Sequence, residues 1–143
     1  MEIASLIAGR ASAEIVRCET GTPVRQVVGT LAERRIGALP VMEGGRVVGI
    51  VSERDVLYCL AKEGGAALDL TVGDVMTAPV ITATPSTKVD EALGLMTERR
   101  IRHLPIVDGE IMCGFISIGD LVKSRIDEAV REAAAMRDYI RTA

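Results

Sequence analysis

ERRIGALPV at residues 33–41 returns as ERRIRHLPI at residues 98–106, and this repetition decides how the rest of the chain is interpreted. The likeness extends on both sides without a gap, so that Ser12–Leu57 aligns with Thr77–Val122. Similarity at a fixed spacing is the sequence signature of a repeated structural unit. The chain is therefore predicted to fold as two copies of one unit.

Each copy is predicted to have the order β-α-β-β-α. A short apolar run suggests a first strand (15–16 and 80–81), and apolar residues at helical spacing predict a first helix (24–31 and 89–96). Two β-rich runs around a glycine turn predict a hairpin, at 39–42 with 46–51 and at 104–107 with 111–116. A second helix is expected to begin at Ser52 and at Ser117, and Pro23 is well placed at the first position of the first helix.

One such unit covers only one face of its sheet with helices, so the two copies should bury their bare faces against each other. The predicted fold class is therefore α/β (α+β), with two β-α-β-β-α repeats packed sheet to sheet and a long C-terminal helix. The expected segments are an N-terminal segment (1–11, with a short helix that covers one end of the pair), a first repeat (12–62), a linker with a short helix (63–76), a second repeat (77–125) and an extension of the last helix (126–143).

The last helix is predicted to run from about Gly119 to Ile140, with an apolar stripe at alternating spacings of three and four residues. An amphipathic helix of this length needs a partner surface. It either folds back on its own domain or docks on a second copy of the chain. We favour the second alternative, so a homodimer is expected.

Composition excludes several classes of partner. With 48% hydrophobic and 26% charged residues, the 143-residue chain has the composition of a folded domain. Lys and Arg number 17 against 20 Asp and Glu, and aromatic residues make up 2%, so neither a basic surface nor a stacking platform for nucleic acid is expected. No apolar stretch has membrane-spanning length and no leader pattern opens the chain, so a cytoplasmic protein without a membrane partner is expected.

Residues that could carry catalysis or bind a metal are scarce. The three cysteines stand singly, without the clustered histidines that complete a metal site. The only histidine is His103, and the sequence has neither a nucleophile elbow nor a phosphate-binding glycine loop. No catalytic residue, catalytic cofactor or metal site is predicted, and the chain is not expected to be an enzyme.

The junction between the hairpin and the second helix has the same polar pattern in both copies: Ser52 with Asp55, and Ser117 with Asp120. One interpretation is a capping box, in which the hydroxyl and the carboxylate satisfy free backbone donors at the helix start. The other is a ligand site, because a carboxylate beside helix N-terminal amides can accept hydrogen bonds from both hydroxyls of a ribose. The residues alone leave both interpretations open.

The paired pattern of strand, helix, x-x-L-P-[VI], glycine hairpin and G-h-h-S-x-x-D resembles the CBS (cystathionine-β-synthase) domain family over roughly residues 12–125. The resemblance implies two repeats joined into a Bateman-type module with two clefts between them. It further implies that the clefts bind adenine nucleotides, AMP first of all, with ADP, ATP, NAD(H) or S-adenosylmethionine as further possibilities.

The resemblance also implies roles for particular residues. Asp55 and Asp120 would hold the ribose, with Ser52 and Ser117 near the phosphate or ribose. Since ligands of the family take contacts from both repeats, Asp55 is expected to work with Arg102 and His103, and Asp120 with Arg54. Further candidates are Thr82 and its counterpart Arg17 on the phosphate side, and Ile118, Gly119 and Lys123 at the second junction.

Each cationic candidate also has a simpler interpretation. Arg102 could be a surface cation, and His103 a core or rim histidine. The arginine pairs at 34–35 and 99–100 are interpreted as charges that complement helix C-termini. Because the two copies agree on Ser and Asp but differ in their cations, we expect two unequal sites.

The predicted function is that of a stand-alone regulatory sensor of adenine nucleotides, in the sense of energy sensing. No effector domain is recognised in the sequence, so the signal would pass to an unknown effector protein. The alternative is a structural homodimerisation module whose clefts are vestigial.

Overall fold

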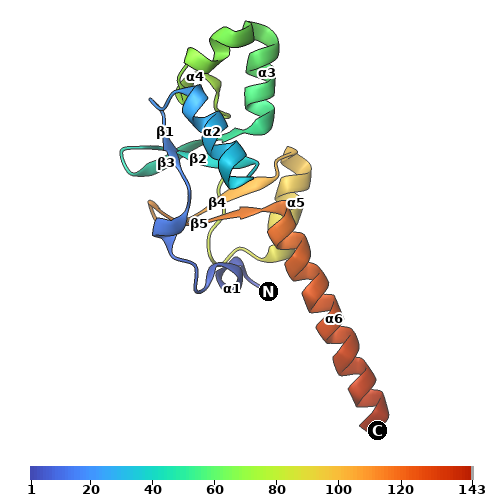
Figure 1. Ribbon diagram of the computed structural model, residues 1–143. Helices are drawn as coiled ribbons and strands as arrows, with labels where there is room; N and C mark the ends of the chain where they lie inside the picture. Colours follow the sequence, from blue (N-terminus) through green and yellow to red (C-terminus); the bar gives the residue numbers. More distant parts are fainter. Residues whose placement is uncertain (143) are drawn as a thin grey trace.

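The computed structural model describes residues 1–142. Figure 1 shows two small sheets, one from each repeat, with helices around them and one long helix that projects from the body. The first sheet has the order β1 (Cys18–Glu19), β2 (Ala38–Glu43), β3 (Arg46–Ser52), and the second pairs β4 (His103–Asp108) with β5 (Ile111–Ser117). The predicted fold class, two repeats of mixed α and β structure with a long C-terminal helix, is confirmed.

Both predicted hairpins are present and have equivalent registers. Ala38 lies opposite Ser52 in the first, and His103 lies opposite Ser117 in the second. Each hairpin has an irregularity at the same place, between Val41 and Met42 and between Ile106 and Val107. A glycine with positive φ follows the first strand of each hairpin, because the tight turn requires a backbone that other residues rarely adopt.

Neither first strand forms where the sequence indicated it. In the first repeat the strand starts at Cys18, which pairs with Val41 of β2 in parallel. In the second repeat the first strand does not form within the described residues. Ala83, which is equivalent to Cys18, makes a single parallel bridge to Ile106. The apolar residues that suggested strands at 15–16 and 80–81 lie at the margins of the cores instead, since Val16 and Ile81 pack against them.

The helices agree closely with the predicted ranges. They are α1 (Ile3–Ile7), α2 (Val24–Arg34), α3 (Glu53–Glu63), α4 (Val72–Val75), α5 (Val89–Arg99) and α6 (Ile118–Thr142), with 3-10 turns at η1 (Ser12–Glu14) and η2 (Gly64–Asp69). The position predicted for Pro23 is wrong by one residue, because Pro23 is the N-cap and has extended backbone. The Thr22 hydroxyl does not cap the helix but accepts a hydrogen bond from the backbone N–H of Glu19 at 3.0 Å.

Each repeat has its own hydrophobic core. The first is built around Val24, Val41 and Val51, and the second around Leu104 and Ile116. The sheets meet where β3 contacts β5, and two connecting segments cross between the repeats. The linker residue Thr77 exchanges backbone hydrogen bonds with Ile50 of β3, and the η1 turn lies on β5.

The short N-terminal helix α1 closes the second core. Ile3 is fully buried there, and its backbone N–H donates to the carbonyl of Thr87 at 2.9 Å. The prediction of a helix that covers one end of the pair is thereby confirmed.

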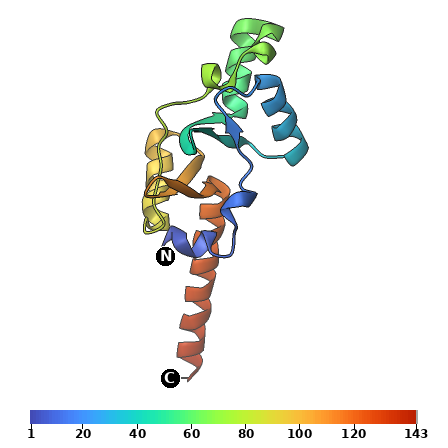
Figure 2. The same cartoon turned by 90° about the vertical axis from the view of Figure 1, so that its left-hand side faces the viewer.

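The helix α6 leaves the body after its first turns (Figures 1 and 2). Leu121 and Ser124 are buried against the body, whereas Ile126 and Val130 are 57% and 60% exposed. The alternative in which this helix folds back on its own domain is therefore wrong. No helix within residues 1–142 combines the length and the apolar character that a membrane crossing requires.

Candidate ligand-binding cleft

A cleft of about 640 Å³ opens between the two repeats where α3 begins. Three stretches form it: the start of α3 in the first repeat, the crossing segment around Thr77, and the end of α5 with the residues that follow. Its lining consists of Gly37, Ile50, Ser52, Glu53, Arg54, Asp55, Leu57, Tyr58, Thr77, Pro79, Val80, Ile81, Arg99, Arg100, Ile101, Arg102 and His103. Asp55, Arg102 and His103, which were expected to work together, thus line the same cleft.

The Ser-x-x-Asp pattern forms a capping box in the first repeat. The backbone N–H and the hydroxyl of Ser52 donate to Asp55 Oδ2 at 2.9 and 3.0 Å, and the Asp55 N–H donates to Ser52 Oγ at 3.2 Å. The other oxygen, Oδ1, accepts from the Thr77 hydroxyl at 2.9 Å. The capping interpretation is therefore confirmed, and it leaves Oδ1 directed at a group from the crossing segment.

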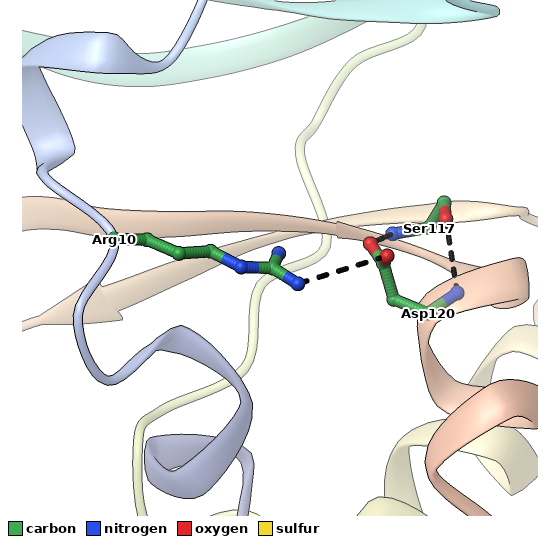
Figure 3. Close-up of polar contacts among 3 residues, drawn as sticks. All are labelled: Arg10, Ser117 and Asp120. Carbon is green, nitrogen blue, oxygen red and sulfur yellow. Dashed lines mark hydrogen bonds and ion pairs between the residues drawn. The ribbon is translucent and has the colours of Figure 1, made fainter.

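The second junction is capped in the same manner but meets a different partner. Ser117 N–H donates to Asp120 Oδ2 at 2.9 Å, and Asp120 N–H donates to Ser117 Oγ at 3.2 Å. Figure 3 shows the Arg10 side chain reaching toward this junction, with Nη2 3.9 Å from Asp120 Oδ1. The cation expected beside Asp120 was Arg54, but Arg54 lines the cleft that contains Asp55. Arg10 was not recognised from the sequence, because it lies outside the aligned repeats.

Four arginines line the cleft: Arg54, Arg99, Arg100 and Arg102. Arg99 and Arg100 were interpreted from the sequence as charges at a helix end, and the structure gives them a second environment on the cleft wall. Arg100 adopts the left-handed conformation that ends α5, with φ of 55°. Glycine usually occupies this position because other residues are strained there. An arginine at the end of a predicted helix was therefore the sign in the sequence that residue 100 is unusual.

His103 lies between the two repeats. Its ring stacks on Phe115 with centroids 5.6 Å apart, and its edge faces Gly37, where a Cβ would come within 3.5 Å of Cε1. Burial lowers the pKa of His103 below its ordinary value, and Arg102 acts in the same direction, against the carboxylates of Asp120 and Glu53. The imidazole is therefore neutral at pH 7, and the positive charge of the cleft comes from its arginines.

The family comparison agrees with this geometry. The chain matches the CBS domain family twice, over residues 8–62 and 72–127. The chain belongs to the CBS-domain family. The repeats predicted from the sequence, 12–62 and 77–125, lie inside the two matched ranges.

Relatives with CBS domains differ greatly in length. The mitochondrial CBS domain-containing protein CBSX3 of Arabidopsis thaliana is 38% identical over 128 residues, which are 86% of this chain and 62% of that protein. The inosine-5'-monophosphate dehydrogenase of Thermoplasma acidophilum is 32% identical over 114 residues, which are 78% of this chain and 22% of the enzyme. The chain thus spans less than two thirds of either relative.

Solved structures of CBS proteins share the fold. A CBS-domain protein from Agrobacterium tumefaciens superposes with a TM-score of 0.81 at 31% identity, covering 87% of this chain and 99% of the other. CBSX2, solved in complex with AMP, superposes with a TM-score of 0.76 at 25% identity, covering 90% and 98%.

The remaining predicted residues lie away from the cleft between the CBS repeats. Thr82 is exposed and outside its lining, and Arg17 donates to backbone carbonyls of its own loop, those of Ser12 and Ile15. At the second junction the N–H of Ile118 donates to the carbonyl of Arg102 at 2.8 Å. Gly119 and Lys123 are exposed on the first turns of α6. Within residues 1–142, no group of three or more His, Cys, Asp or Glu side chains could hold a metal ion.

Proposed function

We propose that this chain is a regulatory module that binds an adenine nucleotide, AMP first of all, in the cleft at Asp55. The observation that carries the proposal is the combination of two carboxylates at a helix N-terminus, Glu53 and Asp55, with four arginines in the same cleft. A ribose donates two hydroxyls, for which a carboxylate is a suitable acceptor, and a phosphate suits arginine because the guanidinium can bind it in a bidentate manner.

The cleft offers a separate surface for each part of a nucleotide. Asp55 Oδ1, which accepts from the Thr77 hydroxyl, would accept from the ribose instead. Arg99, Arg100 and Arg102 would face the phosphate, and the apolar lining, including Val80 and Ile101, suits the flat base. The excess of arginines over the carboxylates of the lining favours anionic nucleotides over S-adenosylmethionine, which carries a positive sulfonium. The AMP complex of CBSX2 supports the same ligand class.

The two junctions are proposed to be unequal sites. A ligand at the second junction has to displace Arg10 from Asp120, whereas at the first it has to displace only a threonine hydroxyl. We therefore expect tight binding at Asp55 and weak binding at Asp120.

Regulation would follow from the fact that the ligand contacts both repeats. A nucleotide held by Asp55 of the first repeat and Arg102 of the second stabilises one relative arrangement of the two cores. It shifts the equilibrium only by its difference in affinity for the two arrangements. The role is regulatory rather than enzymatic, and the signal passes to an effector protein from a homodimer. The cytoplasmic location expected from the sequence stays a prediction.

The second candidate is a structural dimerisation module with empty clefts. The capping boxes favour it, because they explain Ser52 and Asp55 without any ligand. This candidate does not explain why four arginines line one cleft between the repeats.

Thermal unfolding with and without nucleotide separates the two candidates. A ligand that binds only the folded state stabilises it, by about 2.7 kcal/mol at a concentration of 100 times Kd. We expect AMP to raise the Tm of the wild-type protein, Asp55→Asn to lose most of this gain, and Asp120→Asn to keep it. Asn retains an acceptor oxygen for the cap, and both variants lose the same charge at equivalent positions, so each controls for the other.

A wild-type Tm that does not respond to AMP, ADP, ATP or NAD(H) at millimolar concentration would reject the sensor in favour of the structural module. Equal losses in both variants would instead reject the unequal sites.

A further inference from the structure

The exposed part of α6 carries a regular pattern of apolar residues. They follow one another at alternating spacings of four and three residues: Val122, Ile126, Ala129, Ala133, Met136 and Ile140. This is the heptad pattern of a coiled coil, in which Ile126, Ala133 and Ile140 occupy the a positions and the other three the d positions. We call these six residues the α6 seam.

Within the described residues, 1–142, the α6 seam is largely exposed to solvent. Ile126, Met136 and Ile140 are 57%, 61% and 66% exposed, far more than side chains of this kind in the two cores. Contacts with the body go through neighbouring positions, since Leu121 and Ser124 are buried and Arg125 is paired with Asp90 of α5 at 3.2 Å. The seam therefore starts beside the body and continues along the projecting helix (Figure 2).

We propose that the α6 seam pairs with the same seam of a second copy, as a parallel and in-register two-stranded coiled coil. Within parallel coiled coils, β-branched residues at a positions favour two strands, and Ile126 and Ile140 hold the two outer a positions. The alanines at 129 and 133 allow a close approach of the helices but bury little area. We expect self-association in the micromolar range for that reason.

Charge decides the orientation. In a parallel pair, Glu132 at a g position faces Arg137 at the following e position of the partner helix, and this attraction occurs twice by symmetry. In an antiparallel pair that keeps the apolar layers, Glu132 faces its own copy and Lys123 faces Arg137, so like charges meet. Residues 122–142 carry five basic and four acidic side chains, so two copies do not repel each other through net charge.

The proposal rests on the homodimeric state given above and does not depend on nucleotide binding. Sedimentation equilibrium of the full chain tests it with two variants of one residue type. Ala133→Glu places a charge in the α6 seam, and Ala135→Glu places the same charge on the same helix outside it. We expect Ala133→Glu to weaken self-association by at least about tenfold and Ala135→Glu to leave it unchanged.

Disulfide formation tests the orientation. In a parallel, in-register pair, Ala133→Cys brings two thiols within bonding range and gives a covalent dimer, with the wild-type chain as control for its native cysteines. An antiparallel pair separates these positions too far, since Cα atoms more than about 7 Å apart cannot be bridged. A mixture of Ala129→Cys and Ala133→Cys chains would then give a heterodimer instead, which would overturn the parallel arrangement.

If the wild-type protein is a monomer, or if the two glutamate variants self-associate equally, pairing through the α6 seam is rejected. Thermal stabilisation of Ala133→Glu by AMP is measured alongside. Its persistence in a monomer shows that loss of the seam and loss of the nucleotide site are separate results.

Discussion

Asp55 and Asp120 share the two capping hydrogen bonds that involve backbone N–H groups but differ in the group that meets their second oxygen. Thr77 donates a neutral hydroxyl to the first, and Arg10 brings a guanidinium to the second. Thr77 lies on the segment that joins the two repeats, and Arg10 lies on the N-terminal segment that leads into the first repeat. A substitution in a crossing segment should therefore change one site and leave the other intact.

Arg10→Ala should free the second site. The ion pair is long at 3.9 Å, and the two side chains are 52% and 34% exposed, so its loss should change stability little. We expect isothermal titration with AMP to show a second binding event, or a tighter one, at Asp120. Arg25→Ala is the control, because it removes a comparable surface pair with Asp69 away from the cleft. An unchanged titration would mean that Arg10 does not hinder AMP binding at Asp120.

His103 should make the stability of the protein depend on pH. Because burial lowers its pKa in the folded state, the unfolded chain binds the proton more readily near the ordinary value of 6.5. The free energy of unfolding should therefore be largest above that value and fall as the pH drops through it. His103 is the only histidine in the sequence, so any contribution of histidine to this pH dependence comes from His103.

Urea denaturation at pH 7.5 and at pH 5.5 measures this effect, and His103→Gln should reduce the difference between the two pH values. The same pH difference in the variant and in the wild type would assign the effect to other groups.

Arg100→Gly should separate stability from ligand binding. A residue other than glycine in the left-handed region costs about 1–2 kcal/mol, and the entropy of glycine offsets part of the relief. We expect the free energy of unfolding, measured with urea, to change by less than about 1 kcal/mol, while the affinity for AMP falls by about tenfold. Arg35→Gly removes the equivalent arginine, with φ of 53°, from outside the cleft lining and should leave AMP affinity unchanged. Equal affinities in the two variants would exclude Arg100 from the site.

At the scale of elements, the crossing segment around Thr77 is held tightly against β3. A Cβ at Gly49 would lie 2.7 Å from Met76 Sδ and 2.9 Å from the backbone oxygen of Thr77. Gly49→Ala should therefore displace the segment and destabilise the fold by about 1–3 kcal/mol. At the equivalent Gly114 the nearest atom is a side-chain methyl of Ile7, at 2.9 Å, which can move. Urea denaturation should show the smaller loss for Gly114→Ala, and the reverse order would contradict this account.

Local sequence patterns predicted most of the helices and strands. The errors lie where contacts with residues distant in the sequence determine the structure. The hairpins and α2, α3 and α5 follow from short-range spacing and glycine turns. The first strand was misplaced because the apolar residues at Val16 and Ile81 serve core packing rather than strand pairing. Arg99 and Arg100 were predicted to be structural because nothing in the local sequence reveals which surface a helix end faces.

At the scale of the molecule, two separate hydrophobic cores are joined by crossing segments. The cleft takes groups from both repeats, so a bound nucleotide would bridge the cores. The helix α6 begins directly at the second junction and carries the α6 seam away from the body. In the proposed dimer, a change at the second junction would reach the paired copy through this one continuous helix.

By itself the sequence determined the duplication, the order of elements in each repeat, the capping residues and the family resemblance, because these depend on spacing along the chain. Only the tertiary structure decided which groups meet across the repeats. It brought Arg99 and Arg100 into the cleft that contains Asp55, gave Arg10 to Asp120, and left the α6 seam exposed. These contacts depend on how two sheets and two crossing segments pack. The local sequence around each residue does not show which distant residue it will lie beside.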